Sequence, residues 1–216
     1  MTATHHPSDE LLLAHASGAA SEAVSLIAGT HLALCPECRA KTAKMEAMGG
    51  AILSDLAPAA IADSALQSVL ARLDAAPPQQ HPVLRGDGKS FTAPEPLRSY
   101  LAGDLDRVRW RAIAPGIAYR DLFRDRDACA RLIKSGPGRG VGAHTHRGEE
   151  LTLVLTGGFT DATGHYVRGD LQMADGALEH RPLADPGEDC IVLAVCDAPL
   201  KFRSAAVGLL GKLFGF

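Results

Sequence analysis

The sequence from residue 138 to residue 157 reads GRGVGAHTHRGEELTLVLTG and holds a compact set of metal-ligand side chains. His144 and His146 are separated by one residue, so their imidazoles point to the same face of a β-strand. Glu150 follows at an even offset, just before the apolar run at 151–155, and is expected to point into the same cavity. This spacing predicts a metal centre inside a β-structure.

A fourth ligand for this centre is available further along the chain. Gly169 and Asp170 open a turn, and His180 follows eleven residues after Gly169. Three imidazoles and one carboxylate suit zinc, manganese, iron or nickel, and the ligand set alone does not choose among these metals. We therefore expect a divalent metal of unspecified identity.

The chain around this motif has the hydrophobic period of β-structure. From residue 97 to residue 216, short apolar runs at 132–133, 151–155 and 191–195 are separated by glycine-rich turns at roughly ten-residue spacing. Such a pattern is typical of an all-β sandwich or barrel. Residues 97–216 are predicted to form one β-domain.

The N-terminal part, residues 1–75, has the period of helices instead. Ser8 and Ser21 are each followed by acidic residues and are expected to cap two helices. Pro36 suits the first turn of a third helix, which is predicted to end at residue 49 or 50, where two glycines follow each other. A fourth helix is expected after Ser64, and together the helices predict a small bundle. Its apolar residues at helical spacing are Leu66, Val69, Leu70 and Leu73.

Residues 76–96 separate the two parts. Five of the thirteen prolines of the chain fall in this stretch, which has almost no large apolar side chains. This composition is typical of a linker.

The helical part carries a second set of ligands, His31, Cys35 and Cys38, in the pattern H-x3-C-x2-C. The offsets of four and seven residues place the three side chains along one side of two abutting helical turns. Cys35 precedes Pro36 and lies at a helix N-terminus, where the unpaired amides favour a thiolate. Two thiolates and an imidazole indicate zinc.

A structural zinc site takes four ligands, so one is missing from this pattern. His5 or His6, near the start of the chain, is the expected fourth ligand, and His15 is a third choice. A helical unit of about 75 residues has a thin core. Zinc is therefore expected to supply much of its stability.

Composition bounds the class of protein. The chain has 216 residues, 46% of them apolar and 22% charged, which is ordinary for a folded globular protein. Five cysteines and no sign of an export signal predict reduced thiols, metal ligands and a cytoplasmic location. No apolar stretch approaches the ~20 residues of a membrane-spanning helix, so no membrane association is expected.

Charge is unevenly distributed. Residues 1–76 hold four basic and eight acidic side chains, a net charge of −4, whereas the remaining 18 basic and 17 acidic side chains give +1. An acidic helical part suits a basic protein partner. It disfavours a zinc-containing DNA-binding module, because contacts to phosphates supply most non-specific affinity for DNA, and no direct nucleic-acid partner is expected.

Two resemblances arise from these motifs. The stretch at 138–157 resembles the first conserved motif of the cupin superfamily, and residues 169–180 resemble the second, with Asp175 and Ala177 where the family usually has proline and glycine. With the N-terminal H-x3-C-x2-C, nearly the whole chain resembles the ChrR-type anti-sigma factors. In these proteins a zinc-binding helical anti-sigma domain is joined to a cupin-like domain, a β-barrel of the double-stranded β-helix type.

This resemblance implies a function. The helical domain would bind an extracytoplasmic-function sigma factor, wedge between its two DNA- and polymerase-binding regions and keep it from core polymerase. Members of the family respond to singlet oxygen and related oxidants, and the cupin domain is needed for that response but not for inhibition. Cupins often pair, which implies a possible homodimer. The ligands carried over from the family are His6, His31, Cys35 and Cys38 for zinc, and His144, His146, Glu150 and His180 for the second metal.

The rival class is an enzyme. Many cupins with three histidines and one glutamate are dioxygenases, isomerases or oxalate-degrading enzymes that use an open metal position. In that alternative the protein is a cupin metalloenzyme with a zinc-stabilised helical appendage. No second catalytic group is obvious in the sequence, so we expect a protein that is not an enzyme.

Overall fold

The computed structural model describes residues 3–75, 93–101, 103–124, 128–198 and 201–202, without the side chains of residues 74, 75, 201 and 202. Its helices are α1 (Asp9–Ala16), α2 (Glu22–Leu34), α3 (Pro36–Ser54), α4 (Ala65–Ala75), α5 (Leu97–Leu101) and the 3-10 helix η1 (Leu105–Arg107). Its strands are β1 (Arg111–Ala114), β2 (Ile117–Arg124), β3 (Cys129–Ser135), β4 (His144–Thr145), β5 (Glu150–Thr156), β6 (Gly158–Asp161), β7 (Gly164–Val167), β8 (Leu171–Ala174), β9 (Leu183–Ala184), β10 (Cys190–Cys196) and β11 (Lys201–Phe202). The predicted order, helices first and strands after, is confirmed.

The N-terminal helices begin where the sequence indicates. The Ser8 hydroxyl accepts a hydrogen bond from the amide of Leu11, and Ser21 caps α2 in the same way. The prediction that α3 ends at residue 49 or 50 is wrong, because the helix continues to Ser54. A glycine in an exposed helix costs only about 1 kcal/mol relative to alanine, so two glycines do not stop this one. Among the described residues, no helix is long and apolar enough to span a bilayer.

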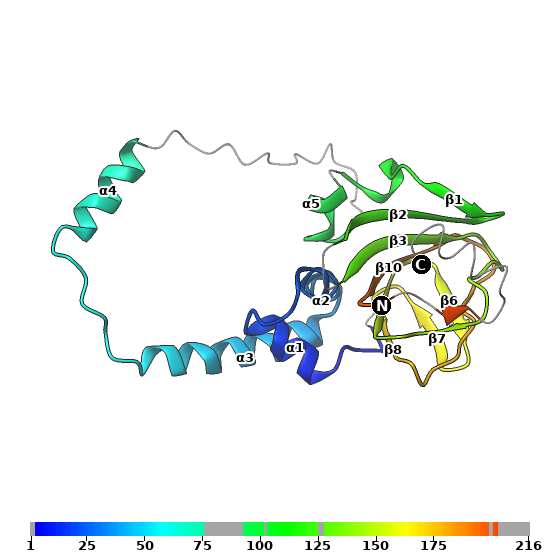
Figure 1. Cartoon of the computed structure of the whole chain (residues 1–216), viewed down its shortest axis with the longest axis horizontal. Helices are drawn as coiled ribbons and strands as arrows, with labels where there is room; N and C mark the ends of the chain where they lie inside the picture. Colours follow the sequence, from blue (N-terminus) through cyan, green and yellow to red (C-terminus); the bar gives the residue numbers. More distant parts are fainter. Residues whose placement is uncertain (1–2, 76–92, 102, 125–127, 199–200, 203–216) are drawn as a thin grey trace.

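The fourth helix does not join the bundle. Helices α1, α2 and α3 pack against one another, whereas α4 stands apart from them and from the strands (Figure 1). Its apolar stripe is exposed, with Leu66 at 63% and Leu73 at 67%. The prediction of a four-helix core is therefore wrong, since helical spacing identifies an apolar face without saying what covers it. We call α1–α3 the helical unit and the part from residue 97 onward the β-domain.

The β-domain is built from sheets that pack face to face. The larger sheet has the strand order β1-β2-β3-β10-β5-β8, and a smaller one has the order β7-β6-β9. All of their pairings are antiparallel. Side chains from both sheets form a buried cluster between them that includes Ile133, Val154, Phe159, Tyr166, Ala184 and Val192. The two facing antiparallel sheets agree with the cupin-like fold that the resemblance implies, although the described strands do not join into one closed barrel.

The outer face of the larger sheet is covered by α2. Leu26 and Ile27 share a buried cluster with Leu153, Leu193 and other residues of the sheet. Strands β5 and β10 are thus buried on both faces, which explains why their sequences are continuous apolar runs and do not alternate. The helical unit and the β-domain therefore share one hydrophobic core, a contact that the sequence analysis did not predict.

Most of the predicted linker, residues 76–92, lies outside the described residues. Its last part does not behave as a free spacer, because Ala93 is buried in the same cluster as Leu97 of α5. The domain limits of 1–75, 76–96 and 97–216 stay a prediction.

Ile27→Ala tests the shared core. Ile27 is fully buried, so removing its side chain leaves a cavity between α2 and the sheet and should lower the free energy of unfolding by about 2–5 kcal/mol. Ile52→Ala is the matched control, because Ile52 is 69% exposed and should change that free energy by no more than about 0.5 kcal/mol. Urea denaturation followed by circular dichroism measures both, and equal effects of the two substitutions would disprove the packing.

Candidate metal centres

The helical unit brings together His6, His31, Cys35 and Cys38. Their ligand atoms all lie within 4.8 Å of one another, and all but His6 are buried. The Nδ1 atom of His6 is 3.5 Å from the Sγ of Cys35 and 3.3 Å from the Sγ of Cys38. Four donors of the Cys2His2 type at this spacing form a closed set of the kind that structural zinc occupies.

The local sequence explains this convergence. Cys35 ends α2 and is at the same time the N-cap of α3, and Pro36 occupies the first turn. The Sγ atom of Cys35 accepts a 3.5 Å hydrogen bond from the amide of Cys38, so the two sulfurs are held on one side of the start of α3. His31 lies in the last turn of α2 and faces the same point.

The structure brings one of the three candidate fourth ligands to the group, and its role as a zinc ligand stays a prediction. His6 joins the group, whereas His5 turns away and its ring packs against Tyr166 of the β-domain at 4.3 Å between ring centroids. His15 lies in the last turn of α1 and is not part of the group.

Electrostatics fits a cation at this point. Burial lowers the pKa of His31 to about 4, so its ring is neutral. Its Nδ1 atom lies 2.9 Å from the carbonyl oxygen of Gly169 and donates to it, which leaves a lone pair on Nε2, a buried atom without a hydrogen-bond partner. Burial also raises the pKa of Cys38 to about 12, so a thiolate there needs a bound cation. These residues therefore fit a zinc ion.

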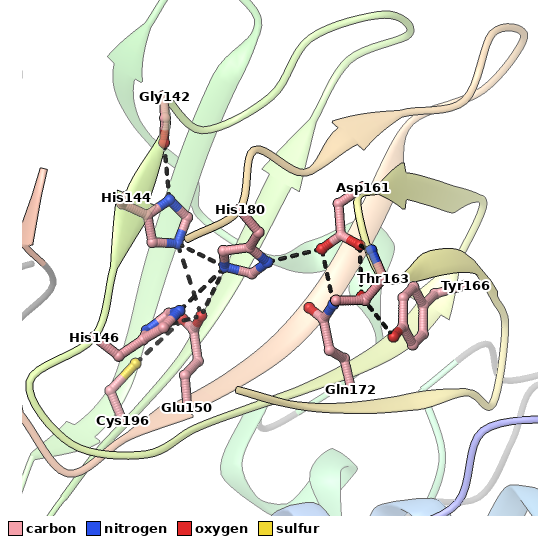
Figure 2. A network of polar contacts seen from close by, with 10 residues as sticks. All are labelled: Gly142, His144, His146, Glu150, Asp161, Thr163, Tyr166, Gln172, His180 and Cys196. Atoms are coloured by element: carbon pink, nitrogen blue, oxygen red, sulfur yellow. Dashed lines mark hydrogen bonds and ion pairs between the residues drawn. The ribbon is translucent and has the colours of Figure 1, made fainter. Parts of the chain in front are cut away.

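The β-domain brings together the second predicted set, His144, His146, Glu150 and His180 (Figure 2). Their ligand atoms also lie within 4.8 Å of one another, and all four residues are buried. The Nε2 atom of His180 is 3.0 Å from that of His144 and 3.1 Å from that of His146. The carboxylate of Glu150 completes the group, 3.9 Å from the Nε2 atoms of His144 and His180.

The backbone fixes His180 beside His144 although 36 residues separate them. The two residues form an antiparallel bridge, with amide-to-carbonyl distances of 3.1 and 3.0 Å. The turn before His180 lacks the usual proline and glycine of its motif. Asp175 replaces them, because its side chain accepts from the amide of Ala177 and its carbonyl from that of Leu178.

Hydrogen bonds set the tautomers of this group. The Nδ1 atom of His144 donates to the carbonyl of Gly142 at 2.8 Å, and that of His180 donates to Asp161 at 2.7 Å. Both Nε2 atoms therefore present lone pairs to each other, which a cation between them would stabilise. Burial raises the pKa of Glu150, but the neighbouring His144 and His146 bring it below its ordinary value, so Glu150 is an anion. This donor set fits a divalent metal.

Asp161 is a supporting residue that the sequence analysis missed. Burial raises its pKa, but hydrogen bonds from Thr163, Gln172 and His180 outweigh that effect and lower it to about 2. Asp161 is thus a permanent acceptor for His180, the role that an outer-shell carboxylate has at a metal-bound histidine. Its only sign in the sequence is a turn, DATG at 161–164, and turns of this kind are common.

A cavity of about 60 Å³ adjoins the second group. Its walls include Ile133, Phe159 and Val192, and His144, Glu150 and His180 close one side. Such a volume holds about four water molecules.

Comparisons with known proteins agree with both parts. A family model described as the ChrR cupin-like domain matches residues 99–200. The anti-sigma-E factor ChrR of Cereibacter sphaeroides is 44% identical over 214 residues, 99% of each chain. A chain of the crystal structure of Rhodobacter sphaeroides SigE in complex with the anti-sigma ChrR superposes with a TM-score of 0.80 at 42% identity, covering 91% of this chain and 100% of that one.

Asp161→Asn should weaken the second centre. Without the carboxylate that orients His180, metal affinity is expected to fall about 10- to 100-fold. Elemental analysis for zinc, manganese, iron and nickel after dialysis against a weak chelator should find two metal ions per wild-type chain and one per variant chain, one for each ligand group. Asp189→Asn, an exposed aspartate of the same domain paired with Lys134, is the control and should retain two. Retention of both ions by Asp161→Asn would contradict the assignment.

Proposed function

The chain belongs to the ChrR family of anti-sigma factors, and from this membership we propose that it is a cytoplasmic, zinc-dependent anti-sigma factor. Its partner in this proposal is an extracytoplasmic-function sigma factor, which it sequesters from core polymerase. The β-domain senses oxidative stress of the singlet-oxygen type and triggers release.

The observation that carries the proposal is two exposed apolar stripes, one at the end of α3 and one along α4. The first is formed by Met48, Ile52, Leu53 and Leu56, and the second by Leu66, Val69, Leu70 and Leu73, all between 47% and 69% exposed. We call the two stripes together the α3–α4 surface. Exposed apolar patches of this kind mark binding surfaces, and an amphipathic helix with an open stripe is suited to a groove in a partner protein.

Inhibition follows from mass action. A sigma factor held on the α3–α4 surface cannot offer the same regions to polymerase, so the free sigma concentration falls in proportion to the affinity of the complex. Each 1.4 kcal/mol lost from the interface raises the dissociation constant about tenfold. A signal that weakens the complex by a few kcal/mol is therefore enough to release the sigma factor.

The two metal centres have different roles in this proposal. The Cys2His2 set of the helical unit binds zinc structurally, because it is buried and closed by four protein ligands. The three histidines and Glu150 of the β-domain bind zinc, manganese, iron or nickel, and the small cavity beside them gives an oxidant access to the group. The first centre preserves the fold of the inhibitor, and the second receives the signal.

The thiols of the β-domain are weaker candidates for sensing. Burial raises the pKa of Cys190 to about 12 and that of Cys196 well above its ordinary value, so neither is a ready thiolate. The Sγ atom of Cys196 lies 3.3 Å from Oε1 of Glu150, so an oxidant that reaches the metal group also reaches this sulfur. Attack at the metal group is the step we favour.

The enzyme alternative is not favoured, because the 44% identical relative is an anti-sigma factor and not an enzyme. A homodimer through the β-domain stays a prediction.

Leu70→Asp and Leu73→Asp test the sigma-binding surface. Both side chains are exposed, so the fold should be unaffected, but a charge in the apolar contact should weaken binding to the sigma factor at least tenfold. Ser68→Asp places the same charge on the other face of α4 and is the control. Calorimetric titration with the cognate sigma factor gives the affinities, and equal binding by all three variants would exclude α4 as the contact.

A further inference from the structure

Two of the four ligands in the helical unit are held by the β-domain. His31 donates from Nδ1 to the carbonyl of Gly169 at 2.9 Å, across 138 residues of sequence. His6 is the last residue of a short segment, residues 3–6, whose backbone is hydrogen-bonded to the turn at residues 169–171. We call these the N-terminal strap and the 169–171 turn.

Asp170 is the centre of this contact. It is fully buried, and its Oδ1 atom accepts from the backbone amides of Thr4 at 2.6 Å and His5 at 3.0 Å, while Oδ2 accepts from Val167 at 2.9 Å. Although burial raises its pKa, these hydrogen bonds bring the pKa below the ordinary value, so the carboxylate is charged. A buried carboxylate that accepts three amides fixes the backbone of the strap.

The next residue of the turn fixes the peptide that leads to His6. The amide of Leu171 donates to the carbonyl of His5 at 3.0 Å. That carbonyl and the amide of His6 belong to one planar peptide unit. The β-domain thus positions the backbone immediately before the His6 ring, whose Nδ1 faces the two cysteine sulfurs.

Glycine is required where the strap meets the turn. Gly169 has a φ of +96°, a conformation that side chains disfavour. A Cβ there would make ordinary contacts with Ala3 of the strap at 3.6 Å and Leu34 of α2 at 3.8 Å, so the backbone conformation and not the lack of space favours glycine. In this conformation the carbonyl of Gly169 accepts from His31.

Strand β8, which continues the 169–171 turn, also reaches the second metal group. The side chain of Gln172, directly after Leu171, donates to Asp161 Oδ2 at 2.8 Å, and that oxygen accepts from His180 (Figure 2). Consecutive residues of one segment, 169 to 172, therefore contact His31, the strap and the network that orients His180. A displacement of His180 has a short hydrogen-bonded route to the ligands of the helical unit.

We propose that Asp170 is a positioning residue for the metal centre of the helical unit, and that the 169–171 turn makes the metal affinity of that centre depend on the state of the β-domain. The regulatory meaning rests on the proposed function: a change at the second metal group loosens the strap, withdraws His6 and weakens the zinc-dependent inhibitor. The positioning role itself does not require a sigma factor.

Cobalt titration of the full-length apoprotein tests this role. Cobalt bound by thiolates gives charge-transfer absorption in the near ultraviolet. Of the two ligand groups in the described part of the chain, the one in the helical unit contains cysteines and the other does not, so this band reports the helical unit's centre. Asp170→Asn should lower the cobalt affinity measured from this band about 10- to 100-fold, which is the loss that removing an outer-shell partner causes. Asp189→Asn, with an exposed carboxylate far from the strap in sequence, should leave it unchanged.

A second pair of variants keeps the test decisive if Asp170→Asn does not fold. Thr4→Pro removes the backbone donor to Asp170, whereas Thr4→Ala keeps that donor and removes only the hydroxyl. The proline variant should lower the cobalt affinity measured from the charge-transfer band, and the alanine variant should not. Wild-type affinity in Asp170→Asn, or in Thr4→Pro where the first variant is unfolded, would overturn the proposal. Because the assay contains no sigma factor, its failure is distinct from a failure of anti-sigma function, which a binding titration reports separately.

Discussion

The stability of the helical unit depends on contacts beyond its own small hydrophobic cluster. Its own buried cluster consists of Ala3, Leu12 and the two metal-site cysteines, which is too little apolar surface to hold three helices together. It is completed on one side by the Cys2His2 group and on the other by the larger sheet, against which α2 buries Leu26 and Ile27. Docking on the β-domain therefore supports the helical unit on one side, and in our proposal metal ligation supports it on the other.

This division of contacts explains why the chain leaves apolar helices open. One face of α2 packs on the sheet and the start of α3 carries the ligand group, so among the described side chains the end of α3 and residues 65–73 of α4 stay largely uncovered. It also gives the proposed signal a route from one domain to the other. The strap and the 169–171 turn place ligands of both centres within a few hydrogen bonds of one segment, and the two centres need no direct contact.

The two ligand sets could be predicted from sequence because their spacing is local: four and seven residues along helices, two and six around a strand. His180 could be predicted only because residues 169–180 resemble the second cupin motif. The choice of His6 over His5 was not derivable from spacing, because it depends on Asp170, 164 residues away from His6, which binds the strap and leaves His5 facing Tyr166. The exposure of α4 could not be predicted from the sequence either, because an apolar stripe has the same spacing whether a core or a partner covers it.

Hydrogen-exchange mass spectrometry of the full-length, metal-loaded protein, alone and with its sigma factor, tests the central claim most directly. We expect the sigma factor to protect the amides of α4 and the second half of α3, while the strands around the second metal group exchange as before. Protection confined to the β-domain, with α4 exchanging freely in the complex, would contradict it.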